Sequence, residues 1–172
     1  SETVAWTWAV RPAQPDAKLP NVLLEGDSIS RNYFPEVQRQ LAGKANMYLL
    51  ANSFCVGDPS LPAEVRLFGK MEGVRFLVVH FNNGAHGIDY SDARYKAGFP
   101  AYLAALRSIA PRATFIWATT TPLKSDSGPG VPNPRIEARN AIALGFVSMM
   151  VVDDQHALME KHQDLYVDNV HF

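Results

Sequence analysis

The chain has 172 residues, of which 47% are hydrophobic and 19% charged, and its net charge is −1. One globular domain with a substantial core is expected from this balance. The 16 basic and 17 acidic residues form no basic run, which argues against nucleic acid as a partner, and no apolar stretch is long enough to span a membrane. The single cysteine, Cys55, excludes a disulfide within the chain and leaves the compartment open.

The first 20 residues contain two tryptophans and three prolines and show no hydrophobic period. We expect them to form an extended N-terminal arm on a body that spans residues 21–172. Trp6 and Trp8 are expected to pack this arm onto the body, with stacking on a sugar as the alternative.

Strands and helices are predicted to alternate through the body. The expected strands are 21–25, 46–50, 75–81, 114–119 and 149–153, and the expected helices are 28–42, 61–71, 91–110, 134–145 and 154–162. A Pro/Gly-rich loop is expected at 122–134. The alternation predicts a flavodoxin-like fold of three layers, α/β/α, with a five-stranded parallel sheet.

Polar residues follow the first four predicted strands, at the points where the strands end. They are Asp27 and Ser28, then residues 55–58, 82–87 and 119–121. Because ligands of such sheets bind outside the carboxyl ends of the strands, these residues mark the expected site.

Ser28 stands in the stretch G-D-S-I-S, at a sharp turn from a strand into a helix. A serine in this position can be a nucleophile beside the N–H groups of the first helical turn, or an ordinary helix cap. Gly26 and Ser28 supply half of a G-x-S-x-G nucleophile elbow, since position 30 is serine. The stretch alone does not decide between the two interpretations.

Asp168 and His171, spaced as D-x-x-H near the end of the sequence, are the candidate partners of Ser28. The carboxylate can hold the ring by its Nδ1–H while Nε2 faces a serine. Of the other histidines, His80 is expected in the core, His156 and His162 at the surface, and His86 in the turn after the third strand. The spacing of the histidines and of Asp89 fits no metal site, Cys55 is expected to be a small buried residue, and no nucleotide or dinucleotide motif is present, so no cofactor is expected.

Taken together, these blocks resemble the SGNH (GDSL-type) hydrolases. The resemblance rests on G-D-S-I-S, the loop glycine Gly57, the polar turn after the third strand and D-N-V-H, and it covers most of the chain from residue 21 onward. It implies Ser28 as nucleophile and oxyanion donor, Gly57 as a second oxyanion donor, and Asp168 and His171 as the other catalytic residues.

The third block departs from the family's usual G-x-N-D. It reads F-N-N-G-A-H-G and is similar to a subgroup with F-N-x-G-x-H. The third oxyanion donor is therefore His86, Asn82 or Asn83, and spacing does not choose among them. The family's final helix after the histidine is not expected, because the sequence ends at Phe172.

The resemblance implies an esterase for small acyl groups, notably acetyl, on a carbohydrate or another small-molecule ester. Transfer of the acyl group to a sugar hydroxyl is one alternative. A non-catalytic module that binds a glycan or a protein partner at the same sheet edge is the other.

Overall fold

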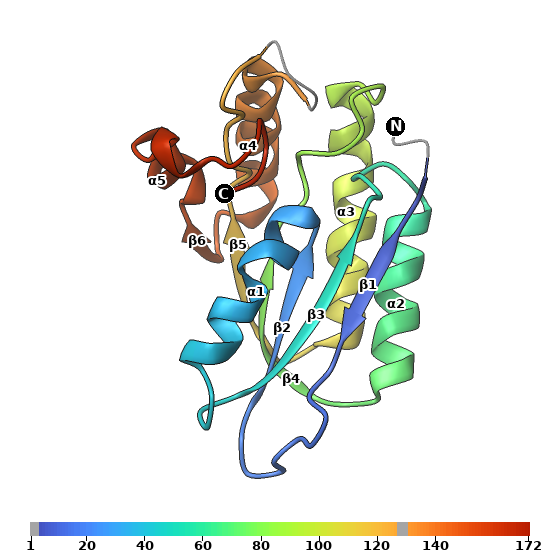
Figure 1. Ribbon diagram of the computed structural model, residues 1–172. Helices are drawn as coiled ribbons and strands as arrows, with labels where there is room; N and C mark the ends of the chain where they lie inside the picture. Colours follow the sequence, from blue (N-terminus) through green and yellow to red (C-terminus); the bar gives the residue numbers. More distant parts are fainter. Residues whose placement is uncertain (1–3, 127–130) are drawn as a thin grey trace.

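A computed structural model describes residues 4–126 and 131–172, which form three layers, α/β/α, around one sheet (Figure 1). Residues 1–3 of the expected arm and 127–130 of the expected loop lie outside this description. The strands are β1 (Thr7–Val10), β2 (Asn21–Gly26), β3 (Asn46–Asn52), β4 (Phe76–Phe81), β5 (Thr114–Ala118) and β6 (Val151–Asp153). The helices are α1 (Ser28–Gln40), α2 (Ser60–Glu72), α3 (Asp92–Ile109), α4 (Asn133–Val147), α5 (Gln155–Glu160) and the 3-10 turn η1 (Gln163–Leu165).

The sheet has six strands in the order β1-β3-β2-β4-β5-β6, so the expected number of five was wrong. The additional strand is β1, which belongs to the expected arm and pairs antiparallel with β3, whereas the other strands are parallel. Its four residues are mostly exposed and show no alternation, because β1 is an edge strand whose paired residues are 39 to 45 positions away.

Side chains of the central strands alternate between two cores. Leu23 in β2 and Tyr48 and Leu50 in β3 face the larger core, which α2, α3 and α4 complete. Leu24 and Leu49 face a smaller core under α1. Burial on both faces explains why β2 and β3 read as near-continuous apolar runs in the sequence.

Ser28 begins α1 at the place where the strand order reverses. From β2 the chain continues to its neighbour β3 on one side, and then crosses to β4 on the other side. In open α/β sheets such a switch point leaves a crevice at the carboxyl ends of the strands. The topology thus places the expected site in that crevice.

One acidic side chain, Glu25, is fully buried beneath this crevice. The hydroxyl group of Tyr102 in α3 donates a hydrogen bond to Glu25 Oε2, and Oε1 has no partner among the described residues. Burial raises the pKa of Glu25 well above its ordinary value, and the neighbouring Asp27 carboxylate raises it further. The folded protein therefore holds the Glu25 proton more tightly than the unfolded chain does.

We expect Glu25 to make the folded state less stable as the pH rises. Because the pKa is higher in the folded state, the stabilisation is complete below about pH 4.5 and is lost as the pH rises through the folded-state pKa. Glu25→Gln keeps an acceptor for Tyr102 and has no proton to lose. Urea unfolding between pH 4.5 and 8 should therefore show a smaller loss of stability for this variant than for the wild type. Glu137→Gln, at an exposed position, is the control, and parallel pH curves for the wild type and Glu25→Gln would contradict the assignment.

Candidate active site

Ser28 occupies the first position of α1, immediately after the turn that ends β2. The carboxylate of Asp27 caps the helix by accepting the Ile29 N–H at 2.9 Å, so Ser28 is not the N-cap residue. A side chain at Gly26 would place its Cβ 2.3 Å from Ser30 Oγ, and the turn thus requires glycine there. The Ser28 hydroxyl therefore takes no part in capping the helix. It lies beside N–H groups of the first helical turn, which have no acceptor within the helix.

The two ends of the body meet at Ser28. His171 Nε2 lies 2.8 Å from Ser28 Oγ, and His171 Nδ1 lies 2.7 Å from Asp168 Oδ2. With the proton on Nδ1 donated to the carboxylate, Nε2 is left to accept the Ser28 O–H. The structure therefore brings together the three residues that the sequence marked, although they are separated by up to 143 positions.

Asp168 also organises its own loop. Its Oδ1 accepts the backbone N–H groups of Val170 at 2.7 Å and His171 at 2.8 Å, which closes the D-x-x-H segment into a tight turn. The hydrogen bond from His171, together with these two backbone bonds, lowers the pKa of Asp168 to about 2. The carboxylate, whose side chain is 56% exposed, therefore stays ionised well below neutral pH.

The loop after β5 anchors the segment that carries His171. Asn169 accepts the N–H of Lys124 on its carbonyl oxygen and the N–H of Ser125 on its side chain, both at 3.0 Å. Val170 packs on the small cluster of Leu123, Val131 and Ile136. These contacts hold the segment that carries the histidine.

Gly57 lies in the loop after β3, as expected, and its φ of 98° is in the region that favours glycine. A Cβ at this position would meet the backbone oxygen of Arg94 at 2.9 Å, so the close approach of α3 also demands glycine. The Gly57 N–H has no acceptor among the described residues.

The two asparagines after β4 have structural partners. Asn82 donates its amide hydrogens to the Ala118 carbonyl at 2.6 Å and to Thr120 Oγ1 at 3.1 Å. Asn83 accepts the Val56 N–H and donates to the Phe54 carbonyl, which ties the third-block loop to the loop that carries Gly57. Both amides are therefore engaged in holding loops together, and His86 stays a prediction as the third oxyanion donor.

His86 is carried by a loop that one buried guanidinium holds. Arg139 in α4 donates to four backbone carbonyls of this loop, at distances from 2.6 to 2.9 Å; the carbonyls belong to Gly84, His86, Gly87 and Tyr90. Sequence analysis missed Arg139. Its role could have been suspected, because it is a charged residue on the apolar side of a predicted helix. Such a residue is rarely buried without a structural or functional partner.

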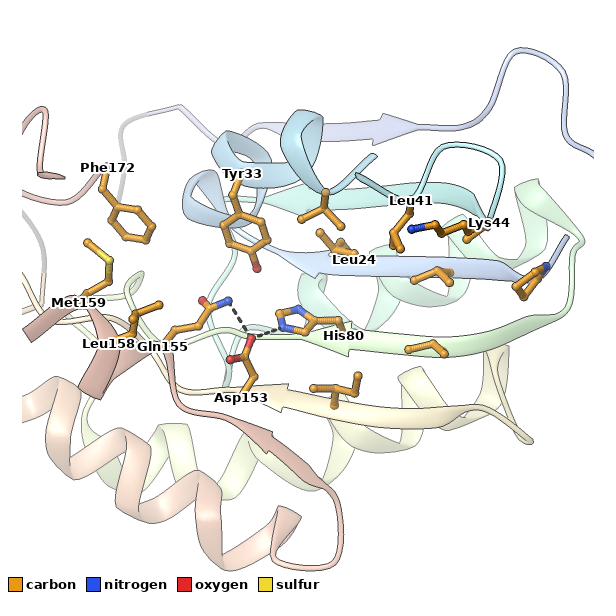
Figure 2. Close-up of a pocket in the computed structure, with 16 residues that line it drawn as sticks. Leu24, Tyr33, Leu41, Lys44, His80, Asp153, Gln155, Leu158, Met159 and Phe172 are labelled. Carbon is orange, nitrogen blue, oxygen red and sulfur yellow. Dashed lines mark hydrogen bonds and ion pairs between the residues drawn. The ribbon is translucent and has the colours of Figure 1, made fainter. Parts of the chain in front are cut away.

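An apolar groove of about 680 Å³ lies on the α1 side of the sheet, next to the site (Figure 2). Its few polar groups include His80, whose Nε2 lies 3.0 Å from Asp153 Oδ2, and Gln155, which donates to the same oxygen. Tyr33 and Phe172 are among the side chains that line it. Ser28 is not among the residues that line this groove.

Three other expectations concern single residues. His80 is largely buried, and His162 is exposed, as expected. His156 was expected at the surface, but its side chain is only 14% exposed, and its Nδ1 lies 2.8 Å from the Thr120 carbonyl oxygen, because α5 folds back onto the end of β5. Cys55 is buried, and burial raises the pKa of its thiol to about 11.

In the part of the chain that the structure describes, no group of three or more His, Cys, Asp or Glu side chains is arranged to hold a metal ion. Among the same residues, no helix combines the length and apolarity needed to cross a membrane.

Comparison with known proteins identifies the fold of the chain but not its family. Neither protein-family models nor curated protein sequences match the chain. A carbohydrate esterase of family 3 from Talaromyces cellulolyticus superimposes with a TM-score of 0.64 at 17% identity, over 89% of this chain and 88% of that one.

Two bacterial structures match equally well. A GDSL-like lipase from Bacteroides thetaiotaomicron gives a TM-score of 0.65 at 15% identity, over 93% of this chain and 83% of its own. A lipase/acylhydrolase from Enterococcus faecalis gives 0.63 at 20% identity, over 90% and 87%. The chain thus has the three-layer α/β/α fold of the SGNH hydrolases.

Proposed function

We propose that this protein is a serine esterase that removes a small acyl group, with acetyl as the first candidate, from a carbohydrate through an acyl-enzyme. The observation that carries the proposal is the continuous chain of hydrogen bonds from Ser28 Oγ through His171 to Asp168, at 2.8 and 2.7 Å. This chain provides a nucleophile, a base and a group that orients the base. The fold shared with esterases and acylhydrolases adds support.

In the first half of the reaction Ser28 Oγ attacks the ester carbonyl while His171 Nε2 takes its proton. Asp168 keeps the ring oriented and stabilises the imidazolium that forms. The C–O bond to the alcohol breaks, the imidazolium gives its proton to the departing oxygen, and Ser28 retains the acyl group. Water then attacks the acyl-enzyme with the same histidine as base, and the carboxylic acid leaves.

Negative charge on the carbonyl oxygen is stabilised by N–H groups already in place. We assign this role to the backbone N–H groups of Ser28 and Gly57 and to the His86 side chain. Arg139 then acts as a positioning residue, because it holds the loop that carries His86 by four carbonyls. When the acyl group of the ester is bound in this arrangement, the alcohol part of the ester lies outside the crevice.

Two alternatives use the same site. Transfer of the acyl group to a sugar hydroxyl requires the same acyl-enzyme, and product analysis with an added alcohol distinguishes transfer from hydrolysis. A non-catalytic binding module would need no contact between Ser28 and His171, and the 2.8 Å distance therefore favours an enzyme.

Ser28→Ala should abolish esterase activity, because the nucleophilic oxygen is lost and the buried framework of the turn is unchanged. We expect the rate of p-nitrophenyl acetate hydrolysis to fall by at least about 10³-fold, with an unchanged circular dichroism spectrum. A fluorophosphonate probe should label the wild type once, at Ser28, and should not label the variant. Equal rates for the two proteins would rule out the mechanism.

Asp168→Asn should leave the nucleophile and the fold in place but weaken the base. The amide cannot stabilise the imidazolium as a carboxylate does, and we expect kcat/KM for p-nitrophenyl acetate to fall by about 10²- to 10⁴-fold. Asp164→Asn, at an exposed position in η1, is the matched control and should retain full activity. A loss of less than threefold in Asp168→Asn would show that the contact with His171 is only structural.

A further inference from the structure

Arg31 carries a positive charge close to Ser28 and has no anionic partner among the residues that the structure describes. It lies three residues after Ser28 on α1, a spacing that makes the two side chains neighbours on the helix surface. Its guanidinium carbon lies 5.6 Å from the ring centre of Trp6 and 4.9 Å from that of Trp8. Within residues 4–126 and 131–172, the guanidinium contacts these two rings and donates to no protein acceptor.

The register of the sheet brings the two tryptophans to the edge where Ser28 stands. Trp8, Ala51 and Gly26 form one row across β1, β3 and β2, which places Trp8 about 10 Å from Gly26 at the usual strand spacing. Trp6 is two residues nearer the carboxyl edge, where its carbonyl accepts the Ser53 N–H. Trp6 is therefore level with Ser28, two strands away.

Trp6 also reaches the loop on the other side of β2. Its ring lies edge-on to His86, with the ring centres 6.0 Å apart. Because His86 follows β4 and Trp6 precedes β1, this contact passes over the ends of β2 and β3. The rings of Trp6 and Trp8 and the guanidinium of Arg31 thus form one wall beside the crevice that holds Ser28.

The side chains of this wall suit a sugar ring that has an apolar face and carries an acidic group at its edge. Trp8 is 51% exposed although it is a large aromatic side chain, and an exposed indole can pack against the C–H face of a sugar. An unpaired guanidinium binds carboxylates in bidentate fashion. A neutral sugar would use the indole and leave the charge uncompensated, whereas an acidic sugar would use both.

We propose that Trp6, Trp8 and Arg31, the tryptophan–arginine platform, form a subsite for the alcohol part of the substrate, and that this part is an acidic sugar of the uronic acid type. The sugar ring lies on Trp8, its carboxylate meets Arg31, and the acyl group reaches Ser28. This assignment rests on the esterase function proposed above and adds to it the class of the alcohol.

The first experiment compares three esters: an O-acetylated oligogalacturonide, an O-acetylated xylo-oligosaccharide and p-nitrophenyl acetate. We expect the wild type to favour the acidic oligosaccharide over the neutral one in kcat/KM. Arg31→Gln should reduce kcat/KM for the acidic ester about tenfold or more, which corresponds to one charge-assisted hydrogen-bonded pair, and should remove the preference. Rates with p-nitrophenyl acetate should change by less than about twofold.

Two further variants separate stacking from charge. Trp8→Ala should lower kcat/KM for both oligosaccharides, mainly through KM, and Trp8→Phe should restore part of it. Arg39→Gln, in the last turn of α1 and paired with Glu36, is the matched control for removing a positive charge from the helix. No preference of the wild type for the acidic ester, or equal losses with all three esters, would overturn the proposal.

A binding measurement separates this proposal from the esterase function. Calorimetric titration of Ser28→Ala with a deacetylated oligogalacturonide should show binding that Arg31→Gln weakens about tenfold or more. Binding without hydrolysis of any ester supports the subsite and rejects the esterase. Hydrolysis of p-nitrophenyl acetate with no binding of the oligogalacturonide rejects the subsite and leaves the esterase in place.

Discussion

The buried guanidinium of Arg139 is the interaction on which the geometry of the candidate site depends most. Loops beyond the carboxyl ends of the strands have no sheet hydrogen bonds to hold them, and the loop after β4 is long and rich in glycine. Four of its carbonyls point at one side chain that is fully buried and anchored on α4. Removing this donor would leave the buried carbonyl of Gly84 without a partner among the described residues, which costs about 1–3 kcal/mol.

The same principle applies to the other loops at this edge. Asn83 joins the loop after β4 to the loop after β3, and Asn169 joins the C-terminal segment to the loop after β5. Each loop is held by a polar side chain from another loop rather than by its own strand. The crevice is therefore a network, and the position of His171 relative to Ser28 is set by contacts that begin at residues 124 and 125.

Much of this arrangement could be predicted from local patterns. The strands β2 to β5 are apolar runs, the helices show a regular period, and G-D-S-I-S and D-x-x-H are short and recognisable. The contact between Ser28 and His171 follows from the sheet topology once those elements are assigned. Their chemical roles are a proposal that rests on this contact.

The features that the sequence did not reveal depend on contacts between residues that are far apart in the chain. β1 is four residues long and is a strand only because β3 offers it an edge. Arg139 lies on the apolar side of its helix, but the carbonyls that it binds belong to the loop of residues 84–90, which is distant in the sequence. Asn82 and His86 could not be ranked by spacing, because the acceptors of Asn82 lie near residues 118 and 120.

The short strand β1 has a second consequence, for the behaviour of the molecule in solution. Every residue of β3 is buried, and without β1 its backbone N–H and carbonyl groups would form a long, flat and apolar edge open to other chains. The opposite edge strand, β6, has only three residues. Both borders of the sheet thus offer few positions for pairing between molecules, and the segment that brings Trp8 to the crevice also guards the protein against aggregation.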